Sequence, residues 1–333
     1  MLERYEPNVR LTFVRNPNYF LPGLPYADGV EVTVDEDPSS RLSTWLAGKY
    51  DFAPEFGMVV RRLDLPLARQ RKPNLQTGDF TVVFGGITWM KIDQEPFKDQ
   101  RVRRALAIAD NWREILETNA WSQGHGSPNP AVPSAFKEWS IPIDQLTPTG
   151  RRTYEHNTAE AKKLLAESGH PTLKFPLETT AAYGPDYIDA VQVVLKNWKA
   201  AGVEAELKLK EYGAYVASTI FGKFEKTAAG LFGLWTDPDA YLYRYYMPGQ
   251  ITNAGGINDP KVTDMIRLQR RTFDVAKRRE IIYDIQRYLA EKVYILYGPS
   301  VNAVAAWEPH VKNFGPNFGL DYGGRLMVAW IDR

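Results

Sequence analysis

The sequence of 333 residues has no cysteine, only four histidines and almost no net charge. The absence of cysteine excludes disulfides, thiolate metal ligands and a cysteine nucleophile. Its 41 basic and 40 acidic side chains leave a formal net charge of +1, which gives no reason to expect nucleic acid or an anionic membrane as the main partner. No apolar run approaches the ~20 residues that cross a bilayer. We therefore expect a globular protein that binds no nucleic acid.

Common catalytic motifs are absent as well. The sequence has no Gly-x-x-x-x-Gly-Lys-Ser/Thr loop, no Gly-x-Gly-x-x-Gly after a strand, no His-Glu-x-x-His and no Gly-x-Ser-x-Gly elbow. The histidines are scattered, mostly in predicted loops, at His125, His156, His170 and His310. We therefore predict that the protein is not an enzyme and that it holds neither a metal nor a cofactor.

The clearest fold signal lies between residues 173 and 210. An alternating segment at 173–177 predicts a strand, a helix follows from Pro185, and a second alternating segment covers 203–209. A strand–helix–strand unit of this kind implies parallel strands and an α/β fold. Further strands are expected near 9–14, 30–34, 51–53, 81–84, 228–235, 293–297, 301–305 and 326–331. Further helices are expected after Asp37, over 99–116 and 157–168, and after Asp259 and Asp274.

Two carboxylate clusters, Asp35 to Asp37 and Asp237 to Asp239, deserve separate interpretations. The first precedes a predicted helix, which favours a capping role. Asp237 follows an apolar segment and Trp235, so it would stand at a strand end, where α/β proteins bind ligands. A carboxylate beside an indole suits a cationic group such as a peptide α-ammonium. On the sequence alone, capping of the next helix is an equally good interpretation of Asp237.

Four groups of segments resemble the dipeptide, oligopeptide and nickel solute-binding proteins of ABC importers, family 5. Their order and spacing over nearly the whole chain make the combination specific, although each motif alone is weak. The segments are Tyr5-x-Pro7, Val14 to Phe20, Gly29 to Glu31, Asp37 to Arg41 and Leu46 to Asp51; Pro96 to Leu106 with Ala109-Asp110; Tyr154, Asn157 and Ala161 to Gly169; and Trp235 to Leu242, Asn258 to Asp264, Asp274 and Arg278-Arg279.

The resemblance implies a type II periplasmic-binding-protein fold, an α/β architecture of two lobes with a hinge. The leading part of the family pattern has no counterpart in this chain, so we expect the first lobe to be incomplete and the signal sequence to lie outside the chain. Residues 1–84 and 299–333 would be the remnant of lobe one, and residues 85–298 would be lobe two. The hinge would lie near Gly85-Gly86 and Gly298-Pro299.

The resemblance also implies a function. We expect a monomer, periplasmic or anchored outside the cell, that captures a peptide or a similar small solute between the lobes and delivers it to an ABC permease. In peptide binders of this family an acidic residue just after a tryptophan holds the ligand's amino terminus, and the segment from Trp235 to Pro238 is shorter than the common form. The predicted ligand-binding residues are Trp235, Asp237, Tyr241, Tyr245, Asn253 and Trp89.

Three alternatives remain open at this stage. Aromatic-rich clefts also stack on sugar rings, so an oligosaccharide-binding member of the family is one alternative. A carbohydrate-active hydrolase that uses Asp237 and a distant carboxylate is the second. The third is a remnant that binds nothing, which an exposed apolar face on lobe one would support.

Overall fold

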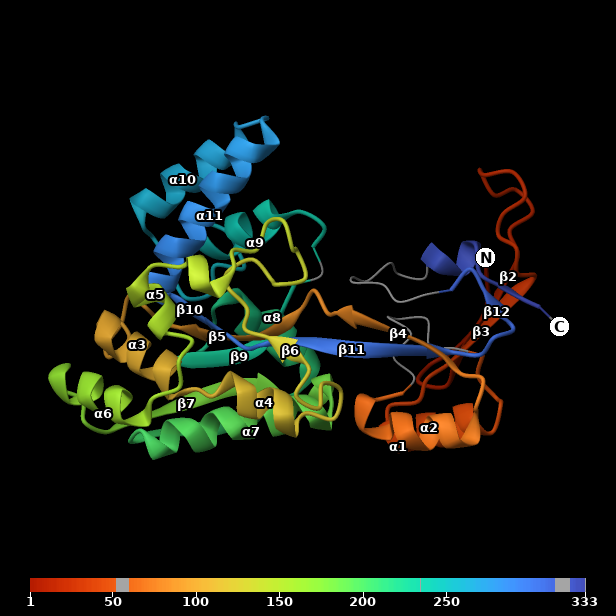
Figure 1. Cartoon of the computed structure of the whole chain (residues 1–333), viewed down its shortest axis with the longest axis horizontal. Helices are drawn as coiled ribbons and strands as arrows, with labels where there is room; N and C mark the ends of the chain where they lie inside the picture. Colours follow the sequence, from red (N-terminus) through yellow and green to blue (C-terminus); the bar gives the residue numbers. More distant parts are fainter. Residues whose placement is uncertain (52–59, 234, 315–323, 333) are drawn as a thin grey trace. The chain divides into compact units, whose positions relative to one another are not determined.

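The computed structural model describes residues 1–51, 60–233, 235–314 and 324–332 (Figure 1). The chain divides into two compact units, which we describe separately. Unit 1 comprises Met1–Phe80, Ala120–Ser122 and Asn302–Arg333; unit 2 comprises Thr81–Asn119 and Gln123–Val301.

Two of the passages between the units lie within strands β4 (Gln76–Thr81) and β11 (Ser300–Trp307), which belong to a three-stranded sheet in the order β4-β11-β6. The glycine pair predicted as a hinge, Gly85-Gly86, lies inside unit 2, where it begins strand β5 (Gly85–Met90). The backbone of Gly298 donates to the Gly86 carbonyl over 2.8 Å. These glycines therefore pair with each other within one unit.

Unit 2 contains a five-stranded mixed sheet in the order β10-β5-β9-β7-β8. The predicted strand–helix–strand unit is confirmed, because β7 and β8 run parallel with α7 between them in the chain. The sheet strands are β7 (Leu173–Thr180), β8 (Val203–Lys210), β9 (Thr227–Phe232) and β10 (Ile295–Tyr297). The helices are α3 (Gln100–Ala109), α4 (Trp112–Thr118), α5 (Pro148–Arg152), α6 (Thr158–Glu167), α7 (Pro185–Ala200), α8 (Tyr212–Ser218), α9 (Pro238–Tyr246), α10 (Pro260–Arg270) and α11 (Val275–Lys292), and a two-residue strand β6 (Gly126–Ser127) lies between α4 and α5.

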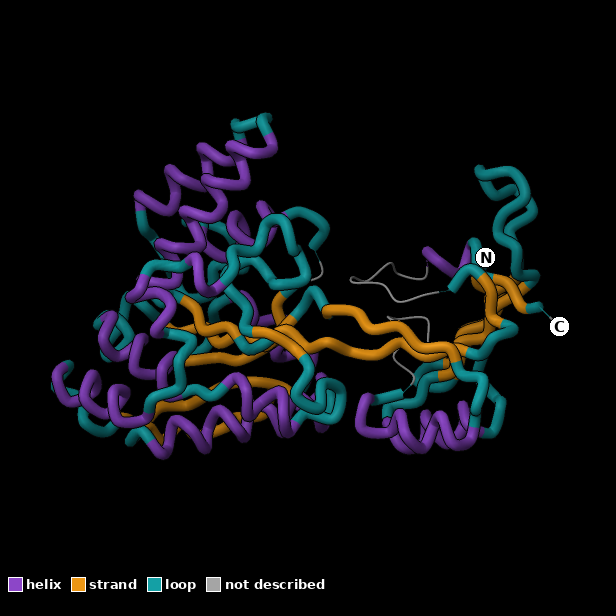
Figure 2. Tube along the Cα trace, viewed as in Figure 1, coloured by secondary structure: helices purple, strands orange, loops and turns teal. Residues whose placement is uncertain are grey.

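Helices cover both faces of this sheet (Figures 1 and 2). Because successive residues of a strand point to opposite faces, neighbouring Trp89 and Met90 of β5 enter different cores. Met90 packs with α3, α6 and α7, where Trp198 is fully buried. Trp89 packs on the other side, with residues of α9, α10 and α11. Unit 2 is thus a three-layer α/β/α unit.

The long helix predicted over 99–116 is wrong, because the chain breaks between α3 and α4. Asp110 has extended backbone angles, φ −71° and ψ 144°, and Asn111 caps α4 by accepting from the Glu114 amide over 3.4 Å. The apolar period continues across the break, so the periodicity alone did not reveal it. Asp99 caps α3 by accepting from the Arg101 amide over 2.7 Å.

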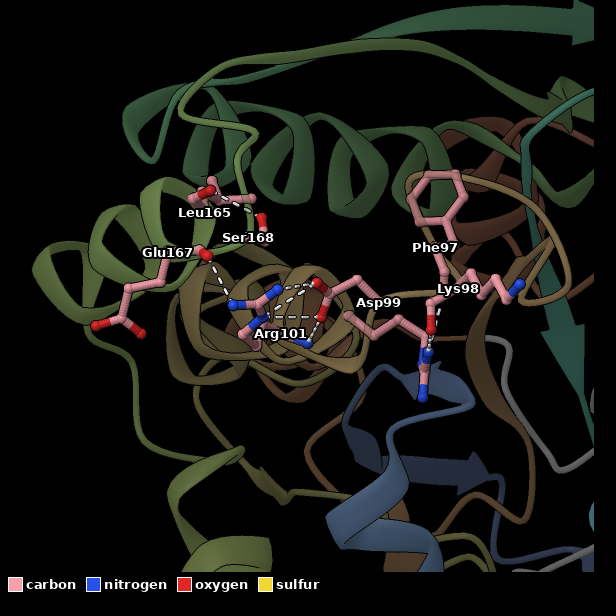
Figure 3. Close-up of polar contacts among 8 residues, drawn as sticks. Phe97, Lys98, Asp99, Arg101, Leu165, Glu167 and Ser168 are labelled. Carbon is pink, nitrogen blue, oxygen red and sulfur yellow. Dashed lines mark hydrogen bonds and ion pairs between the residues drawn. The ribbon is translucent and has the colours of Figure 1, made fainter.

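The motif around α3 has a structural role that Figure 3 makes visible. The Arg101 guanidinium binds the Asp99 carboxylate, with Nη2 and Oδ2 2.6 Å apart, and donates to the Glu167 carbonyl over 2.6 Å at the end of α6. The neighbouring Arg103, which is 4% exposed, donates to the Phe97 carbonyl over 2.7 Å and to the Val293 carbonyl over 2.9 Å. These two arginines join α3 to α6 and to the end of α11.

Unit 1 contains a three-stranded antiparallel sheet, β1-β2-β3, and two short helices. Asp37 caps the first helix by accepting from the Ser40 amide over 2.6 Å, as predicted. Trp45 is fully buried among Leu42, Val60 and Ala306. The elements are β1 (Leu2–Glu6), β2 (Arg10–Val14), β3 (Gly29–Thr33), α1 (Pro38–Leu46), α2 (Leu65–Arg71), β12 (Val311–Lys312) and β13 (Trp330–Ile331).

Four strand predictions differ from the structure. In the predicted strand 326–331 the first residues belong to a 3-10 helix, Gly324–Met327, and only Trp330–Ile331 forms a strand. In the predicted strand 81–84 only Thr81 belongs to a strand, as the last residue of β4, and Val82 and Val83 are buried between β4 and β5 without being part of one. Val293 ends α11 in the left-handed region, at φ 51°, so β10 begins two residues later than expected. The strand predicted at 51–53 falls outside the described residues except for Asp51, which lies in a bend.

Candidate functional site

The candidate site is the junction between β9 and α9, which we define as residues 233–246 apart from residue 234. Gly233 follows β9 with φ +126°, and a Cβ atom there would lie 2.7 Å from the Val83 carbonyl oxygen. Only glycine fits this close approach in that conformation. The chain then turns through Trp235 into the cap of α9.

Asp237 makes two structural contacts. Its Oδ1 accepts from the Asp239 amide over 2.8 Å, which caps α9. The Arg278 guanidinium of α11 binds both carboxylate oxygens, Nη2 to Oδ1 at 2.7 Å and Nη1 to Oδ2 at 3.3 Å. Partial burial acts to raise the pKa of Asp237, but the hydrogen bonds from Arg278 and the Asp239 amide outweigh it and lower the pKa. The cap interpretation is therefore confirmed, and Arg278 already neutralises the carboxylate.

Trp235 is the half-buried aromatic side chain of the junction. The guanidinium of Arg244 lies over its ring, 4.1 Å from the centroid. Its backbone amide donates to the Tyr241 hydroxyl over 3.4 Å. The indole Nε1 is buried near the Tyr245 hydroxyl, and within the described residues it reaches no acceptor at hydrogen-bonding geometry.

Tyr241 and Tyr245 lie beneath the junction, in the core of unit 2. Tyr241 is fully buried, and its hydroxyl donates to the Val83 carbonyl over 3.1 Å. Tyr245 is 6% exposed and packs edge-on against Phe232. These two side chains hold the turn in place and offer a ligand little surface.

The other two predicted residues are not brought to the junction. Trp89 is 3% exposed and pairs with Ala228 near the start of β9, whereas Trp235 follows the end of that strand. Asn253 lies in the loop after α9, where its amide donates to the carbonyls of Met247 and Ile257 over 3.1 and 2.7 Å. Its side-chain oxygen accepts from the Ile257 amide over 2.9 Å. Asn253 therefore fastens a loop.

Sequence reasoning missed the arginines that complete the junction. Arg244 lies over Trp235, and Arg278 binds Asp237 from 41 residues away while lying 5.2 Å from the Trp139 ring centroid. Arg244 lies in the last turn of α9, nine residues after Trp235, and nothing in the sequence pairs Arg278 with Asp237. Long-range pairing of this kind has no local signal.

Two further searches of the described residues bear on function. No group of three or more His, Cys, Asp or Glu side chains is arranged to hold a metal ion. No helix within the described ranges combines the length and apolar character needed to cross a membrane.

Comparison with known families decides the affiliation of the chain. The family model described as bacterial extracellular solute-binding proteins, family 5 Middle, matches residues 1–253. This chain belongs to that family. The family consists of periplasmic or extracellular solute-binding proteins, and the fold is the α/β fold of type II periplasmic binding proteins, as predicted.

Individual relatives of this family 5 chain are distant and longer. It is 24% identical over 302 residues to di/tripeptide-binding protein 3 of Pseudomonas aeruginosa, covering 89% of this chain and 54% of the relative. It is 26% identical over 305 residues to the periplasmic murein peptide-binding protein MppA of Escherichia coli, covering 88% and 52%. The solved structure of AgaA from A. tumefaciens R10 with agropinic acid matches at 22% identity and TM-score 0.82, covering 100% and 66%. The chain thus spans about half the length of the curated relatives it matches.

Proposed function

We propose that this chain is the solute-binding component of an ABC importer and that it captures short peptides outside the cell without cleaving them. The observation that carries the ligand site is the half-buried indole of Trp235, which lies at the turn between β9 and α9 with its Nε1 near the Tyr245 hydroxyl. Trp235 follows a central strand of an α/β unit, the region where such folds bind ligands. Two named relatives are binding proteins for di/tripeptides and for murein peptide, which supports the peptide class.

Further parts of the proposal concern the whole protein. Unit 2 is proposed as lobe two and unit 1 as part of lobe one, with the ligand held between lobes that close by population shift. The protein would act as a monomer, periplasmic or anchored at the outer side of the membrane, and would deliver its ligand to a permease. None of these steps requires a cofactor.

Within the candidate site, Trp235 is proposed as the direct ligand contact and Asp237 as a carboxylate shared between Arg278 and a ligand cation. Asp237 retains about half of its side-chain surface, at 52% exposed, so a ligand ammonium has access to it. The core positions of Trp89, Tyr241 and Tyr245 and the loop position of Asn253 favour supporting roles for these four.

The test is a thermal-melt screen of the purified chain against one pool of di- to hexapeptides and one pool of oligosaccharides. A ligand that binds the folded state raises the melting temperature by mass action, so the proposal predicts a saturable rise with the peptide pool alone. Trp235→Phe keeps the ring but removes the N–H, and we expect it to reduce that rise. Tyr243→Phe on the adjacent helix α9 is the matched control, expected to respond like the parent. A rise with the oligosaccharide pool alone would replace the peptide assignment.

A further inference from the structure

The helical hairpin of α10 and α11 ends in an exposed apolar tip, which we define as residues 267–277 (Figure 1). Phe273 at the turn is 95% exposed, the highest value among the large hydrophobic side chains of the described part of the chain. Val275 is 59% exposed and Leu268 is 49% exposed. Single exposed apolar residues are ordinary on protein surfaces, but three around one turn form a cluster.

The same tip concentrates basic charge. Between Asp264 and Arg279 the sequence has six basic and two acidic residues, an excess larger than the +1 of the whole chain. Two of the six face unit 2: Arg270 pairs with Asp239 at 3.4 Å, and Arg278 pairs with Asp237. Arg271 and Lys277 are exposed and make no ion pair with the residues that the structure describes. The tip therefore carries a local excess of positive charge, although the net charge of the whole chain is close to zero.

The turn itself is well fastened, so its exposure is not that of a loose loop. Asp274 caps α11 by accepting from the Lys277 amide over 2.8 Å, and the Thr272 hydroxyl donates to the Leu268 carbonyl over 2.9 Å. Ile266 and Ile282 are fully buried and anchor the two helices in the core of unit 2. The hairpin therefore exposes the Phe273 ring to solvent in an ordered conformation. Packing within the described part of unit 2 does not compensate for the free energy of exposing this ring.

We infer that this tip docks on a bilayer surface that contains anionic phospholipids. An aromatic and two aliphatic side chains suit the boundary between head groups and acyl chains, while Arg271, Lys277 and Arg267 suit lipid phosphates. A tip of one turn is too small for a stable protein–protein interface, which needs a much larger buried area. A membrane requires only a few inserted side chains for weak, reversible contact. This inference does not depend on the identity of the solute.

The test is flotation of the whole chain with two kinds of vesicle, phosphatidylcholine alone and phosphatidylcholine mixed with phosphatidylglycerol. We expect association with the mixed vesicles that weakens as salt is raised, because exposed charges are screened. The variant with both Arg271→Gln and Lys277→Gln should bind at least about tenfold more weakly. Phe273→Ser should also bind more weakly and should keep the parent's melting temperature.

Leu209→Ser is the control, because Leu209 is 54% exposed but lies on strand β8, outside the tip. It should bind vesicles like the parent. Equal association with both vesicle types, or unchanged binding by the tip variants, would overturn the inference. Absence of vesicle binding together with Arg271-dependent binding to immobilised polyglutamate would also overturn it, and would assign the tip to an acidic protein partner.

Discussion

Asp110, at the break between α3 and α4, is a carboxylate in an apolar setting. It borders a small pocket of about 60 Å³ together with Trp112, Tyr154 and Tyr246. Burial raises its pKa to about 7, more than the hydrogen bond from the Asn111 amide lowers it, and the nearby Glu114 adds to the rise. No ion pair to Asp110 is found within the described residues. The folded protein therefore favours the protonated form of this group.

This gives a pH prediction with a definite sign. A raised carboxyl pKa means that the folded state binds the proton more tightly, so stability is full below the unfolded pKa of 3.8 and is lost as the pH rises to about 7. Asp110→Asn removes this dependence, and we expect it to gain on the order of 3 kcal/mol relative to the parent between pH 4 and pH 8. Urea unfolding at both pH values measures the difference. Asp264→Asn, exposed on α10, should show no such gain; an equal difference for Asp110→Asn at both pH values would contradict the assignment.

The Asp237 carboxylate has two roles, because it caps α9 and also forms an ion pair with Arg278. Asp237→Ala removes both, and we expect it to lower the free energy of unfolding by ~1–2 kcal/mol. Asp237→Ser retains a good capping side chain and loses only the contact with Arg278, so it should cost less. Denaturant unfolding of the two variants makes the comparison. Equal losses would show that the cap contributes nothing.

At the residue scale, the sequence predicted those contacts that are local. Asp37, Asp99 and Asp237 were each placed at a helix start, and each accepts an amide hydrogen bond two or three residues ahead. The ion pair between Asp237 and Arg278 was not predictable, because it depends on how α9 and α11 pack. The unpartnered Nε1 of Trp235 was equally invisible, since burial is a property of the folded chain.

At the scale of elements, the sequence predicted β7, α7 and β8 correctly, because Pro185 marks the start of α7 and Gly202 separates α7 from β8. It failed between α3 and α4, where the apolar stripe runs across a break made by Asp110 and Asn111. It also failed at 81–84, since buried valines in a connecting segment resemble a strand. Apolar residues indicate which positions are buried, and only their spacing indicates whether those positions lie in a helix or a strand.

A substitution of Arg103 tests most directly how α3 packs against the end of α11. Its guanidinium donates to the backbone carbonyl of Phe97, before α3, and to that of Val293, after α11. Arg103→Met fills a similar volume but leaves these buried carbonyls without donors, so we expect a loss of ~2–4 kcal/mol in the free energy of unfolding. Denaturant titration checks this value. Lys162→Ala, exposed on α6, should change stability by less than ~0.5 kcal/mol; a similar small effect for Arg103→Met would refute the packing role.

At the scale of the whole molecule, exposed apolar surface is concentrated in unit 1. Of the large hydrophobic side chains exposed in the described part of the chain, twelve lie in unit 1 and six in unit 2, although unit 1 is the smaller. Leu2 and Tyr5 of β1 are 56% and 61% exposed. A surface of this kind usually meets a partner, and we propose that further polypeptide covers it.

The apolar surface of unit 1 gives a simple dye-binding prediction. The chain alone should bind the fluorescent dye ANS, and the variant with Leu2→Ser and Tyr5→Ser should bind distinctly less. Leu209→Ser in unit 2 is the control and should leave the dye fluorescence unchanged. The same fluorescence in all three proteins would show that the surface of β1 is not the accessible apolar patch.

The central claim, that this chain binds a peptide and does not process it, is tested most directly by native mass spectrometry with a short peptide from the responsive pool. We expect a complex of one chain with one peptide, and recovery of the peptide intact after prolonged incubation. Recovery of cleaved peptide, or no complex at peptide concentrations far above those of the chain, would contradict it.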